Sequence, residues 1–521
     1  MPPVPTELLL KIFDSVQNDT PESLRAVYST SREFARVCRP MVYSELQFTA
    51  HKDKKAAPSR RAAQSMEFWC SEAIAPFVRT CIISRGDWGF RAEVVPNGLL
   101  VVFFDAIEHF RGLRKLVVDN ANLDGFLPKI YHGLPALEEL DVDLGLAKDP
   151  AAFTPDDAPG PTRLSRCNVI PRKSLHPFLP FFRLDNVREL NLPLKGFPGT
   201  FPNIAVLSIT GRTNGGEARV LKSLARFPAL EELRLSLENV LDTPLDGALI
   251  GPMQHTLKKI HISEVELLPT FIPGAARVTH IKISGEVAGC QIYHALTSVT
   301  APSVVSFDCN LNVPDTEVIT TLFSAFPHLE ELHFDAYDGR NMEDEDDAYS
   351  DVRRDFFDLL AGWGKYTGTT IPATLKSLMV TWAIEDAHRV GEHWRDMHRL
   401  GREQEYSDED ENSDEDGSEE SATEQPEITV QDDGAEDDDA AAEAEAGEYL
   451  LATRDAIIAR MPALTSLWMD YPPYFVSLRR DAGTGTLSEE FLSIAYEPDL
   501  LGPGLCPGTF WLGPETFWAS R

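Results

Sequence analysis

A nine-residue phrase that recurs along the chain constrains the fold more than any other feature of the sequence. Three copies are close: LPALEELDV at 134–142, FPALEELRL at 227–235 and FPHLEELHF at 326–334. FPNIAVLSI at 201–209 and MPALTSLWM at 461–469 are looser copies. In each copy a proline, which stops a helix and favours extended backbone before it, precedes apolar residues at alternating strand positions. A chain that repeats this phrase five times is expected to consist of helix–proline–strand repeats.

The apolar spacing of the phrase also occurs outside its five copies. Apolar residues at the first, fourth and sixth positions mark segments that begin at Val78, Leu113, Leu137, Leu164, Val187, Ile204, Leu230, Leu257, Val278, Val304, Leu329, Leu375 and Leu464. Most of the gaps between these starts are 21–27 residues long, which lies within the period of leucine-rich repeats. Helical patterns precede several segments, at 99–110, 218–227, 316–326 and 449–461. We therefore expect an α/β fold, an irregular leucine-rich-repeat solenoid (horseshoe) whose units bury their apolar edges against their neighbours.

Residues 1–48 have the pattern of three short helices. The first helix would present one apolar face, made of Leu8, Leu9, Ile12, Phe13 and Val16. Pro21 is expected to begin the second helix, and Ser29 or Ser31 the third, which Pro40 would end. Three short helices make a marginal core, so this unit is expected to lean on another surface. One interpretation is a helical cap that seals the first repeat of the solenoid.

The N-terminal sequence VPTELLLKIFDSVQNDTPESLRAVYSTSREFARVCRPMVYSEL resembles an F-box, as found ahead of degenerate leucine-rich repeats in many fungal F-box proteins. The opening of the family motif is matched by Val4, Pro5, Glu7, Leu8, Leu9, Ile12 and Phe13, and its later part by Leu24, Val27, Arg32, Phe34, Ala35, Pro40 and Tyr43. The sequence departs from the family at Val4, where Leu is usual, and most of the repeats lack the Asn that usually follows each strand.

The resemblance implies a function for both parts of the chain. An F-box of this type docks on the Skp-type adaptor of a cullin–RING ubiquitin ligase (an SCF complex), and the repeats capture a protein substrate whose identity the sequence does not reveal. The chain itself would be non-catalytic and would need no cofactor. The residues expected to bind the adaptor are Pro5, Glu7, Leu8, Leu9, Ile12, Phe13, Leu24 and Val27. The alternative is a ligase-independent repeat scaffold, or an acidic protein that binds histones or other basic proteins.

The charge of the chain is concentrated in one segment. The sequence holds 48 Lys+Arg and 82 Asp+Glu, a formal net charge of −34. Residues 403–448 contain 22 acidic residues and neither Lys nor Arg, which leaves −12 for the rest. This composition predicts a disordered acidic insertion that acts as a spacer, carries phosphorylated Ser407, Ser413 and Ser421, or binds a basic partner. The acidic balance disfavours binding to nucleic acid or to anionic membranes.

These patterns divide the chain into five parts. The expected parts are an F-box-like helical domain at 1–48, a linker at 49–72, a leucine-rich-repeat-like solenoid at 73–402, the disordered acidic insertion at 403–448, and a final repeat with a C-terminal cap at 449–521. A turn at 481–486 between two apolar runs predicts a hairpin in the cap.

No sequence motif indicates catalysis or a metal site. Cys290 and His294 are four residues apart but lack a second pair of ligands, so a packed cysteine and a surface histidine are expected. His388, His393 and His398 advance by about 500° per step on a helix and do not converge. The seven cysteines form no CxxC pair, which favours reduced core residues in a protein of the cytoplasm, the nucleus or both.

The N-terminus lacks the pattern of a signal peptide, and the longest apolar run, Leu99–Phe104, is too short to span a bilayer.

Aromatic residues near the ends of expected strands are candidate substrate contacts. They are Trp382, Trp468, Tyr471 and Tyr474, for which packing in the core or cap is the competing interpretation.

Overall fold

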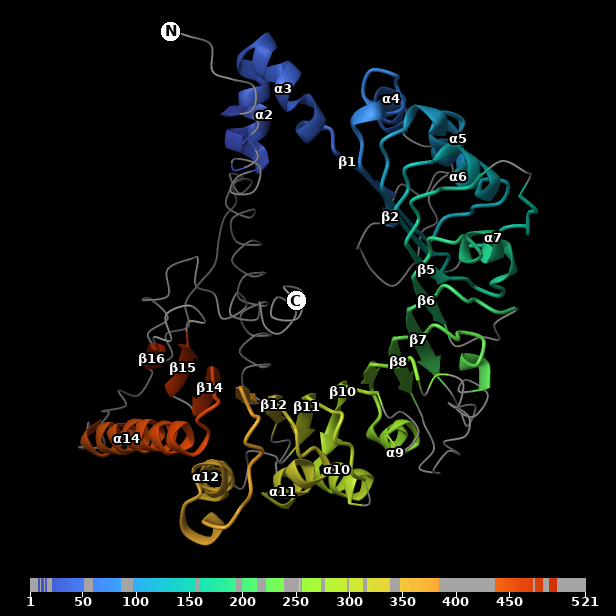
Figure 1. The fold of residues 1–521 in the computed structure, drawn as a ribbon. Coiled ribbons are helices and arrows are strands. Elements are labelled where there is room, and N and C mark those ends of the chain that lie inside the picture. Colours follow the sequence, from blue (N-terminus) through green and yellow to red (C-terminus); the bar gives the residue numbers. More distant parts are fainter. Residues whose placement is uncertain are drawn as a thin grey trace, which may run out of the picture. The chain divides into compact units, whose positions relative to one another are not determined.

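A computed structural model gives the fold of the chain (Figure 1). It describes residues 8–9, 11–13, 15, 21–50, 60–85, 97–145, 147–155, 159–193, 199–212, 222–238, 253, 255–272, 277–297, 299–312, 316–337, 347–383, 436–471, 474–480 and 487–493. These residues belong to two compact units, Met1–Val278 and Thr279–Arg521.

Each unit contains a run of neighbouring strands that follow one another in sequence order. The first unit has β1 (Glu45–Ala50), β2 (Thr80–Arg85), β3 (Lys115–Asp119), β4 (Glu139–Asp143), β5 (Arg166–Ile170), β6 (Glu189–Pro193), β7 (Val206–Arg212), β8 (Glu232–Glu238) and β9 (Lys259–Ile262). The second has β10 (His280–Ala288), β11 (Ser306–Asn312), β12 (Glu331–Tyr337), β13 (Ser377–Ala383), β14 (Ser466–Tyr471), β15 (Tyr474–Arg480) and β16 (Leu487–Ser493). Strands β1 to β9, and β10 to β14, pair in parallel.

The predicted repeat pattern is confirmed. Each of the thirteen segments with apolar residues at positions 1, 4 and 6 leads into one of the strands β2 to β14, and all three apolar side chains of every segment are buried. In the segment of β4, for example, these residues are Leu137, Leu140 and Val142. Position 1 lies on the bend before the strand, and positions 4 and 6 alternate along it, so all three reach the same side of the sheet.

A backbone ladder joins the repeats at the start of each strand. The carbonyl oxygen of Ser44 accepts hydrogen bonds from the N–H groups of Arg79 and Thr80, and the carbonyl of Arg79 accepts from Arg114 and Lys115. In the same way, one carbonyl oxygen accepts from two consecutive N–H groups at each later repeat, as far as Lys259 in the first unit and from Thr279 to Ser466 in the second. Successive units therefore stack at a fixed register, as a solenoid requires.

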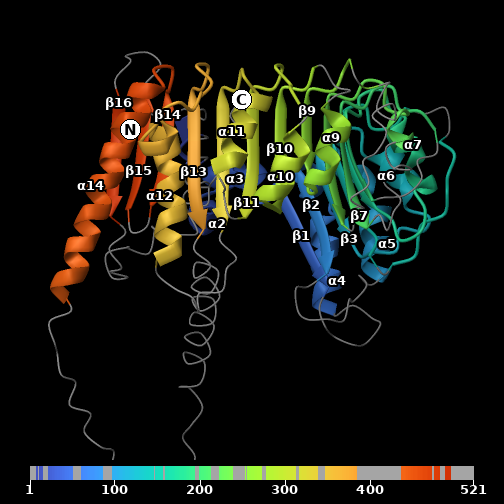
Figure 2. The same cartoon turned by 90° about the horizontal axis from the view of Figure 1, so that it is seen from below.

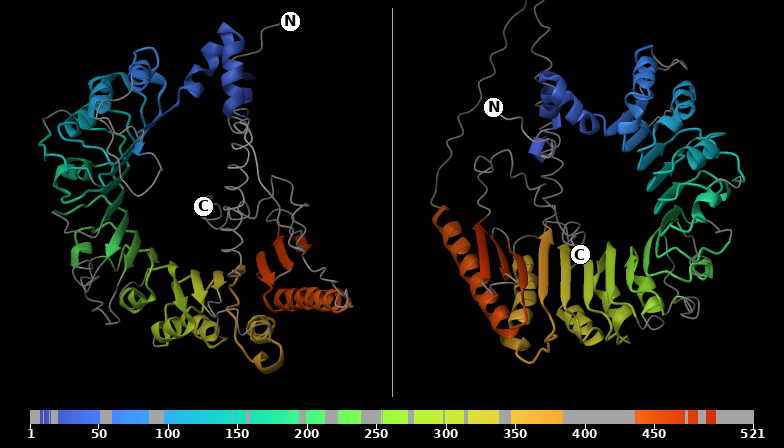
Figure 3. Two further views of the ribbon diagram at one scale, coloured as in Figure 1. Left: turned by 180° about the vertical axis from the view of Figure 1, so that it is seen from behind. Right: turned by 45° about the horizontal axis from the view of Figure 1, so that its top comes forward.

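From residue 60 onward, the helices lie on one side of the strands within each unit (Figures 2 and 3). The first unit has α2 (Pro21–Thr30), α3 (Arg32–Val42), α4 (Arg60–Trp69), α5 (Asn97–Asp105), α6 (Leu127–Gly133), α7 (Leu179–Phe182) and α9 (Leu268–Phe271). The second has α10 (Gly289–Leu296), α11 (Thr316–Ala325), α12 (Asp347–Ala361) and α14 (Glu436–Arg460). Short 3-10 turns are η1 (Ala75–Phe77), η2 (Ile107–His109), η3 (His176–Phe178), η5 (Val265–Leu267) and η7 (Gly364–Tyr366). We call the opposite side of the strands, which faces away from these helices, the strand face.

The N-terminal helices match the prediction except at one end. The hydroxyl of Ser31 accepts a hydrogen bond from the N–H of Phe34 at 3.1 Å and so caps α3. The expected end at Pro40 is wrong, because α3 continues to Val42 with Pro40 inside its last turn. There the N–H of Tyr43 still bonds to the carbonyl of Arg39, so helical hydrogen bonding continues past the proline.

Two expected boundaries are corrected. The linker at 49–72 contains the end of β1 and the whole of α4, so the repeat array begins at Glu45. Arg60 and Arg61 gave this stretch the composition of a linker, but the side chain of Met66 is buried on α4. The acidic insertion lies outside the described residues up to 435, and its last part, 436–448, is the first half of α14.

The expected hairpin of the C-terminal cap is confirmed by its strands. β15 pairs antiparallel with β14 and with β16, and Arg480 pairs with Leu487. The turn at 481–486 and residues 494–521 lie outside the described residues, as do residues 384–402 with the three spaced histidines. The change from parallel to antiparallel pairing after β14 marks the end of the repeats.

Candidate functional site

The three N-terminal helices share a small core of their own. Its buried members are Leu9, Phe13, Leu24, Val37 and Cys38, and the side chains of Val27, Tyr28, Phe34, Met41 and Val42 pack against them. The rings of Phe13 and Phe34 meet edge to face, with their centroids 5.5 Å apart. This core fixes which side of the first helix faces inward.

The opposite side of the first helix carries two exposed aliphatic side chains. Leu8 is 51% exposed and Ile12 is 53% exposed, and they lie one helical turn apart. Of the expected adaptor-binding residues, Leu9, Phe13 and Leu24 are therefore core residues that cannot offer much contact surface, and Val27 is half-buried against them. Pro5 and Glu7 lie outside the described residues.

The helical unit is joined to the solenoid without an intervening linker. α3 ends at Val42 and β1 begins at Glu45. The ring of Tyr43, between them, meets Tyr28 on α2 edge to face and also meets Phe68 and Trp69 on α4. Burial is the main cause that raises the pKa of the Tyr43 hydroxyl above its ordinary value. Aromatic contacts of this kind add to the packing energy, so Tyr43 couples the helices to the first repeat.

The strand face presents one residue from the middle of each strand, and these residues pair directly in register. In the first unit the row is Gln47, Ile82, Val117, Asp141, Asn168, Asn191, Ser208, Arg234 and His261. In the second unit it is Lys282, Asp308, His333, Met379 and Trp468. Both rows occupy position 5 of the repeat, between the two buried strand positions.

Ion pairs between neighbouring repeats neutralise the glutamates of the recurring phrase. The carboxylate of Glu231 lies 2.9 Å from Lys258 Nζ, and that of Glu330 lies 2.7 Å from Lys376 Nζ. Glu139 pairs with Lys115 at 3.1 Å. These side chains face outward, as the sequence indicated, and exposed ion pairs of this kind contribute little to stability.

A carboxylate and an amide meet in the row of the first unit. Asn168 Nδ2 donates a hydrogen bond to Asp141 Oδ1 at 2.8 Å. Burial raises the pKa of Asp141 above its ordinary value, against the opposing effect of Asn168 and of the nearby Lys115 and Arg166. The middle of this row is therefore polar.

A charged cluster forms the start of the row in the second unit. Lys282 Nζ lies 2.8 Å from Asp308 Oδ2, and His333 Nδ1 lies 3.1 Å from Asp308 Oδ1. Asp308 is only 2% exposed. Burial alone would raise the pKa of Asp308, but His333 and Lys282 outweigh it and hold the pKa below its ordinary value. Asp308 is therefore an ionised, buried carboxylate that its two neighbours neutralise.

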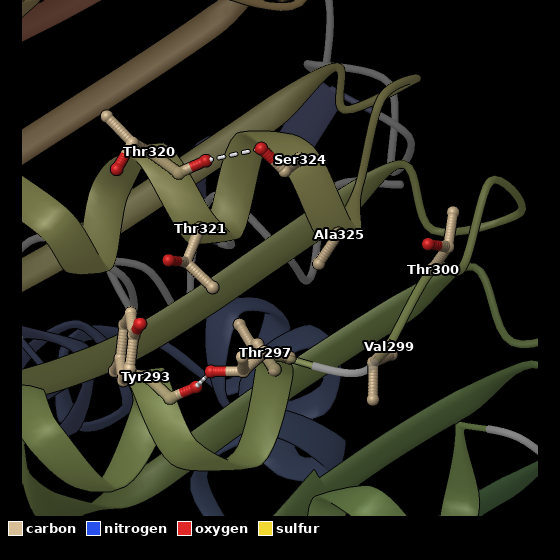
Figure 4. A pocket seen from close by; sticks show the side chains of 9 residues that line it. Tyr293, Thr297, Val299, Thr300, Thr320, Thr321, Ser324 and Ala325 are labelled. Atoms are coloured by element: carbon tan, nitrogen blue, oxygen red, sulfur yellow. Dashed lines mark hydrogen bonds between the residues drawn. The ribbon is translucent and has the colours of Figure 1, made fainter.

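A second candidate is a hollow of about 280 Å³ between α10 and α11, on the helical side of the second unit (Figure 4). Its lining includes the hydroxyl groups of Thr297, Thr320 and Ser324. Each of these hydroxyls already donates to a carbonyl of its own helix: Thr297 to Tyr293, Thr320 to Glu317 and Ser324 to Thr320. The hollow carries no charged side chain, so it offers a ligand little to recognise.

The described part of the chain contains no cluster of three or more His, Cys, Asp or Glu side chains that could hold a metal ion. Among the same residues, no helix has the length and apolar character needed to cross a bilayer. Cys290 is exposed, contrary to the expectation that it is packed, whereas Cys38, Cys70, Cys81, Cys167 and Cys309 are buried.

The comparisons with known proteins bear on the fold alone. No protein-family model matches the chain, and no curated protein matches its sequence. Similar solved structures include an internalin from Listeria monocytogenes, with 10% identity over 63% of this chain and 92% of that chain and a TM-score of 0.26. A protein from Bacteroides fragilis has 15% identity over 54% of this chain and 72% of that chain, with a TM-score of 0.26.

A third similar structure is TLR13 in its complex with ssRNA13, with 12% identity over 56% of this chain and a TM-score of 0.27. The match spans 35% of the TLR13 chain. All three are leucine-rich-repeat proteins. Because these TM-scores are low, the assignment of a repeat solenoid rests on the strand order, the backbone ladder and the buried positions of this chain.

Sequence reasoning identified one residue of the second row and missed the others. Trp468, a candidate contact from the sequence, lies in the row, whereas the side chains of Trp382, Tyr471 and Tyr474 lie outside the described residues. Lys282, Asp308, His333 and Met379 were missed. They all stand at position 5 of the repeat, between two buried positions, and this offset was the signal that could have found them.

Proposed function

We propose that the chain is a substrate-recognition subunit of an SCF-type cullin–RING ubiquitin ligase. In this proposal the N-terminal helices dock on the Skp-type adaptor, the strand face of the solenoid binds a protein substrate, and partner subunits transfer ubiquitin. The F-box-like sequence motivates the proposal. The observation that carries it is the pair Leu8 and Ile12, exposed one turn apart on a helix whose other side is packed in the core.

The exposed pair has the geometry of a helix-in-groove contact. Aliphatic side chains at i and i+4 form a single strip along a helix, and such strips bind apolar grooves in partner proteins. Leu9 and Phe13 support this surface from beneath, since they anchor the helix to Leu24 and Val37. The continuous passage from α3 into β1 joins the proposed adaptor-binding helices directly to the first repeat.

The test is co-purification of a Skp-type adaptor with the full chain. We expect a stoichiometric complex with the unmodified chain and loss of the adaptor with the double variant Leu8→Asp/Ile12→Asp. A matched control is Val101→Asp/Ile170→Asp, which places the same charges at aliphatic residues of the first unit that are 42% and 37% exposed. Circular dichroism would establish that each variant remains folded.

Failure of the unmodified chain to bind the adaptor would overturn the proposal, as would equal loss of binding in the control. The alternative function is a ligase-independent scaffold that binds histones or other basic proteins. It is favoured by the 22 acidic residues at 403–448, where Lys and Arg are absent. Histone binding that needs this segment, and that weakens steeply between low and high salt, would support the alternative.

A further inference from the structure

The strand face of the second unit carries a row of five residues with a change of chemistry along it. Lys282 pairs in register with Asp308, Asp308 with His333, His333 with Met379, and Met379 with Trp468. For each of the five, the preceding and the following residue in the sequence are buried in the core. Because side chains alternate along a strand, all five side chains point to the strand face. The row is continuous across strands β10 to β14.

One end of the row presents the ammonium group of Lys282, which forms an ion pair with Asp308 and remains partly exposed. Lys282 is 37% exposed on its side chain, and its ammonium group has three N–H donors. Asp308 is buried, and its carboxylate already interacts with Lys282 and His333 of the same protein. An incoming partner therefore meets the ammonium group of Lys282 and not the carboxylate of Asp308.

The other end of the row presents apolar surface. Met379 and Trp468 are half-buried neighbours on β13 and β14. The pair two residues earlier on the same side of these strands is Ser377 and Ser466, whose side chains are small. On β15, Trp468 pairs in register with Ser477, which is also small. Met379 and Trp468 are therefore partly exposed large apolar side chains with small polar neighbours, and such side chains commonly act as contact anchors.

We propose that this row binds an extended protein segment that has a carboxylate side chain at one end and a bulky apolar side chain at the other. The carboxylate lies against Lys282, and the apolar side chain lies over Met379 and Trp468. This inference rests on the proposed function, because it names the class of substrate segment that the strand face would take.

The strand spacing sets the separation of the two groups. Neighbouring strands lie about 4.8 Å apart, so three to four spacings between Lys282 and the apolar pair cover roughly 14–19 Å. An extended peptide advances about 3.3 Å per residue, so the acidic and apolar residues are separated by roughly four to six positions.

Charge complementarity argues against a polyanion at the same place. A nucleic acid needs several cations along its backbone, whereas this row offers Lys282 beside a buried carboxylate. The neighbouring start of β12 adds Glu330 and Glu331, and Glu330 already holds Lys376. A single carboxylate on a protein segment fits one exposed ammonium group better than a chain of phosphates does.

The test is selection from a random dodecapeptide phage library on the full chain in complex with its Skp-type adaptor, or on the full chain alone if no adaptor binds. We expect a consensus with Asp or Glu and a large apolar residue roughly four to six positions apart. Lys282→Gln should remove the acidic preference, and Met379→Gln should remove the apolar one. Each variant should weaken binding of the consensus peptide roughly tenfold by fluorescence polarisation.

Matched controls separate the row from general surface effects. Lys365→Gln removes another lysine of the second unit that lies 2.9 Å from an aspartate, and Ile170→Gln removes an exposed aliphatic residue elsewhere on a strand. Both should leave the consensus unchanged. A basic consensus, no consensus, binding insensitive to Lys282 and Met379, or tight binding of a single-stranded RNA probe at this row would overturn the inference.

The two proposals fail independently. Co-purification of the adaptor, measured on Lys282→Gln and Met379→Gln, should be unchanged. Retained adaptor with no peptide consensus would overturn the substrate inference alone. If the unmodified chain does not bind the adaptor but still selects the peptide consensus, the ligase role alone would be overturned.

Discussion

Arg460, the last residue of α14, donates a hydrogen bond from Nη1 to the backbone carbonyl oxygen of Leu359 near the end of α12, at a distance of 2.7 Å. The same nitrogen lies 3.1 Å from the carbonyl oxygen of Leu360, and Nη2 donates to the carbonyl of Thr369. Carbonyls in the last turn of a helix have no partner within that helix. Arg460 therefore completes the end of a helix that precedes it by about 100 residues.

Replacement of Arg460 with methionine should destabilise the second unit by about 1–3 kcal/mol, because the carbonyls of Leu360 and Thr369 lose the guanidinium donor and the carbonyl of Leu359 keeps only the N–H of Gly362. Urea unfolding followed by circular dichroism measures the change. The control is Lys365→Met, which breaks an exposed pair with Asp355 and should cost less than about 0.5 kcal/mol. Equal effects of the two variants would contradict the role of Arg460.

Three glycines near Arg460 form a graded series. Gly362 has φ of +75°, and an added Cβ would lie 2.7 Å from Arg460 Nη1. Gly364 has φ of +54° but open space around it, and Gly368 has open space and an ordinary φ. Substitution by alanine should therefore destabilise most at Gly362, by about 1 kcal/mol at Gly364 through backbone strain alone, and least at Gly368. Thermal unfolding of the three variants checks the order.

The core of the solenoid could be predicted from the sequence because its repeat has a local cause. Three apolar residues at fixed offsets, preceded by a proline in the five copies of the phrase, specify a bend and a strand. A single match to this spacing occurs often by chance, so the recurrence of the segments at similar gaps made the repeats recognisable. β1 was missed, although Tyr43, Leu46 and Phe48 have the same offsets, since these residues were assigned to the helical motif. One stretch of sequence here serves both the helical unit and the first repeat.

The candidate sites could be predicted only in part, because they depend on contacts between distant residues. Leu8 and Leu9 are equivalent by sequence, and only packing against Leu24 and Val37 decides that Leu9 turns inward. The row of the second unit depends on register between strands that are far apart in sequence. Met379 and Trp468 become neighbours across 89 residues because β13 pairs directly with β14.

Stability should depend on pH through Asp308. Its folded pKa lies below the ordinary value of 3.8, because His333 and Lys282 outweigh the effect of burial. The stabilisation is therefore present above pH 3.8 and is lost as the pH falls through the lower folded value. Asp308→Asn should cost about 2 kcal/mol at pH 7. This difference from the unmodified chain should shrink steadily below pH 3.8, as followed by urea unfolding at each pH, and a constant difference would contradict it.

Thiol reactivity should separate Cys290 from the buried cysteines. Cys290 is exposed, whereas burial raises the pKa of Cys70 to about 12 and raises that of Cys81 and Cys167 further. Since the thiolate is the reactive form, brief maleimide treatment at pH 7 should label Cys290 and leave these three unmodified. Peptide mapping by mass spectrometry checks the sites, and the same treatment in urea should label all four. Native labelling of Cys81 would contradict the packing described.

Removal of most of the acidic insertion should leave the fold intact. β13 pairs with β14 from Ser377 to Val380, and Tyr449 Oη donates to Asp358 Oδ1 at 2.9 Å. These contacts close the second unit on both sides of the insertion. Because loop closure costs only about 0.6 kcal/mol per doubling of loop length, replacing residues 390–430 with a short Gly-Ser linker should change the free energy of unfolding by less than about 1 kcal/mol.

Tyr449→Phe, which removes the anchoring hydroxyl, should cost about 1 kcal/mol in either background. A large loss of stability from the deletion, with Tyr449→Phe silent, would mean that the insertion itself holds the last repeat in place.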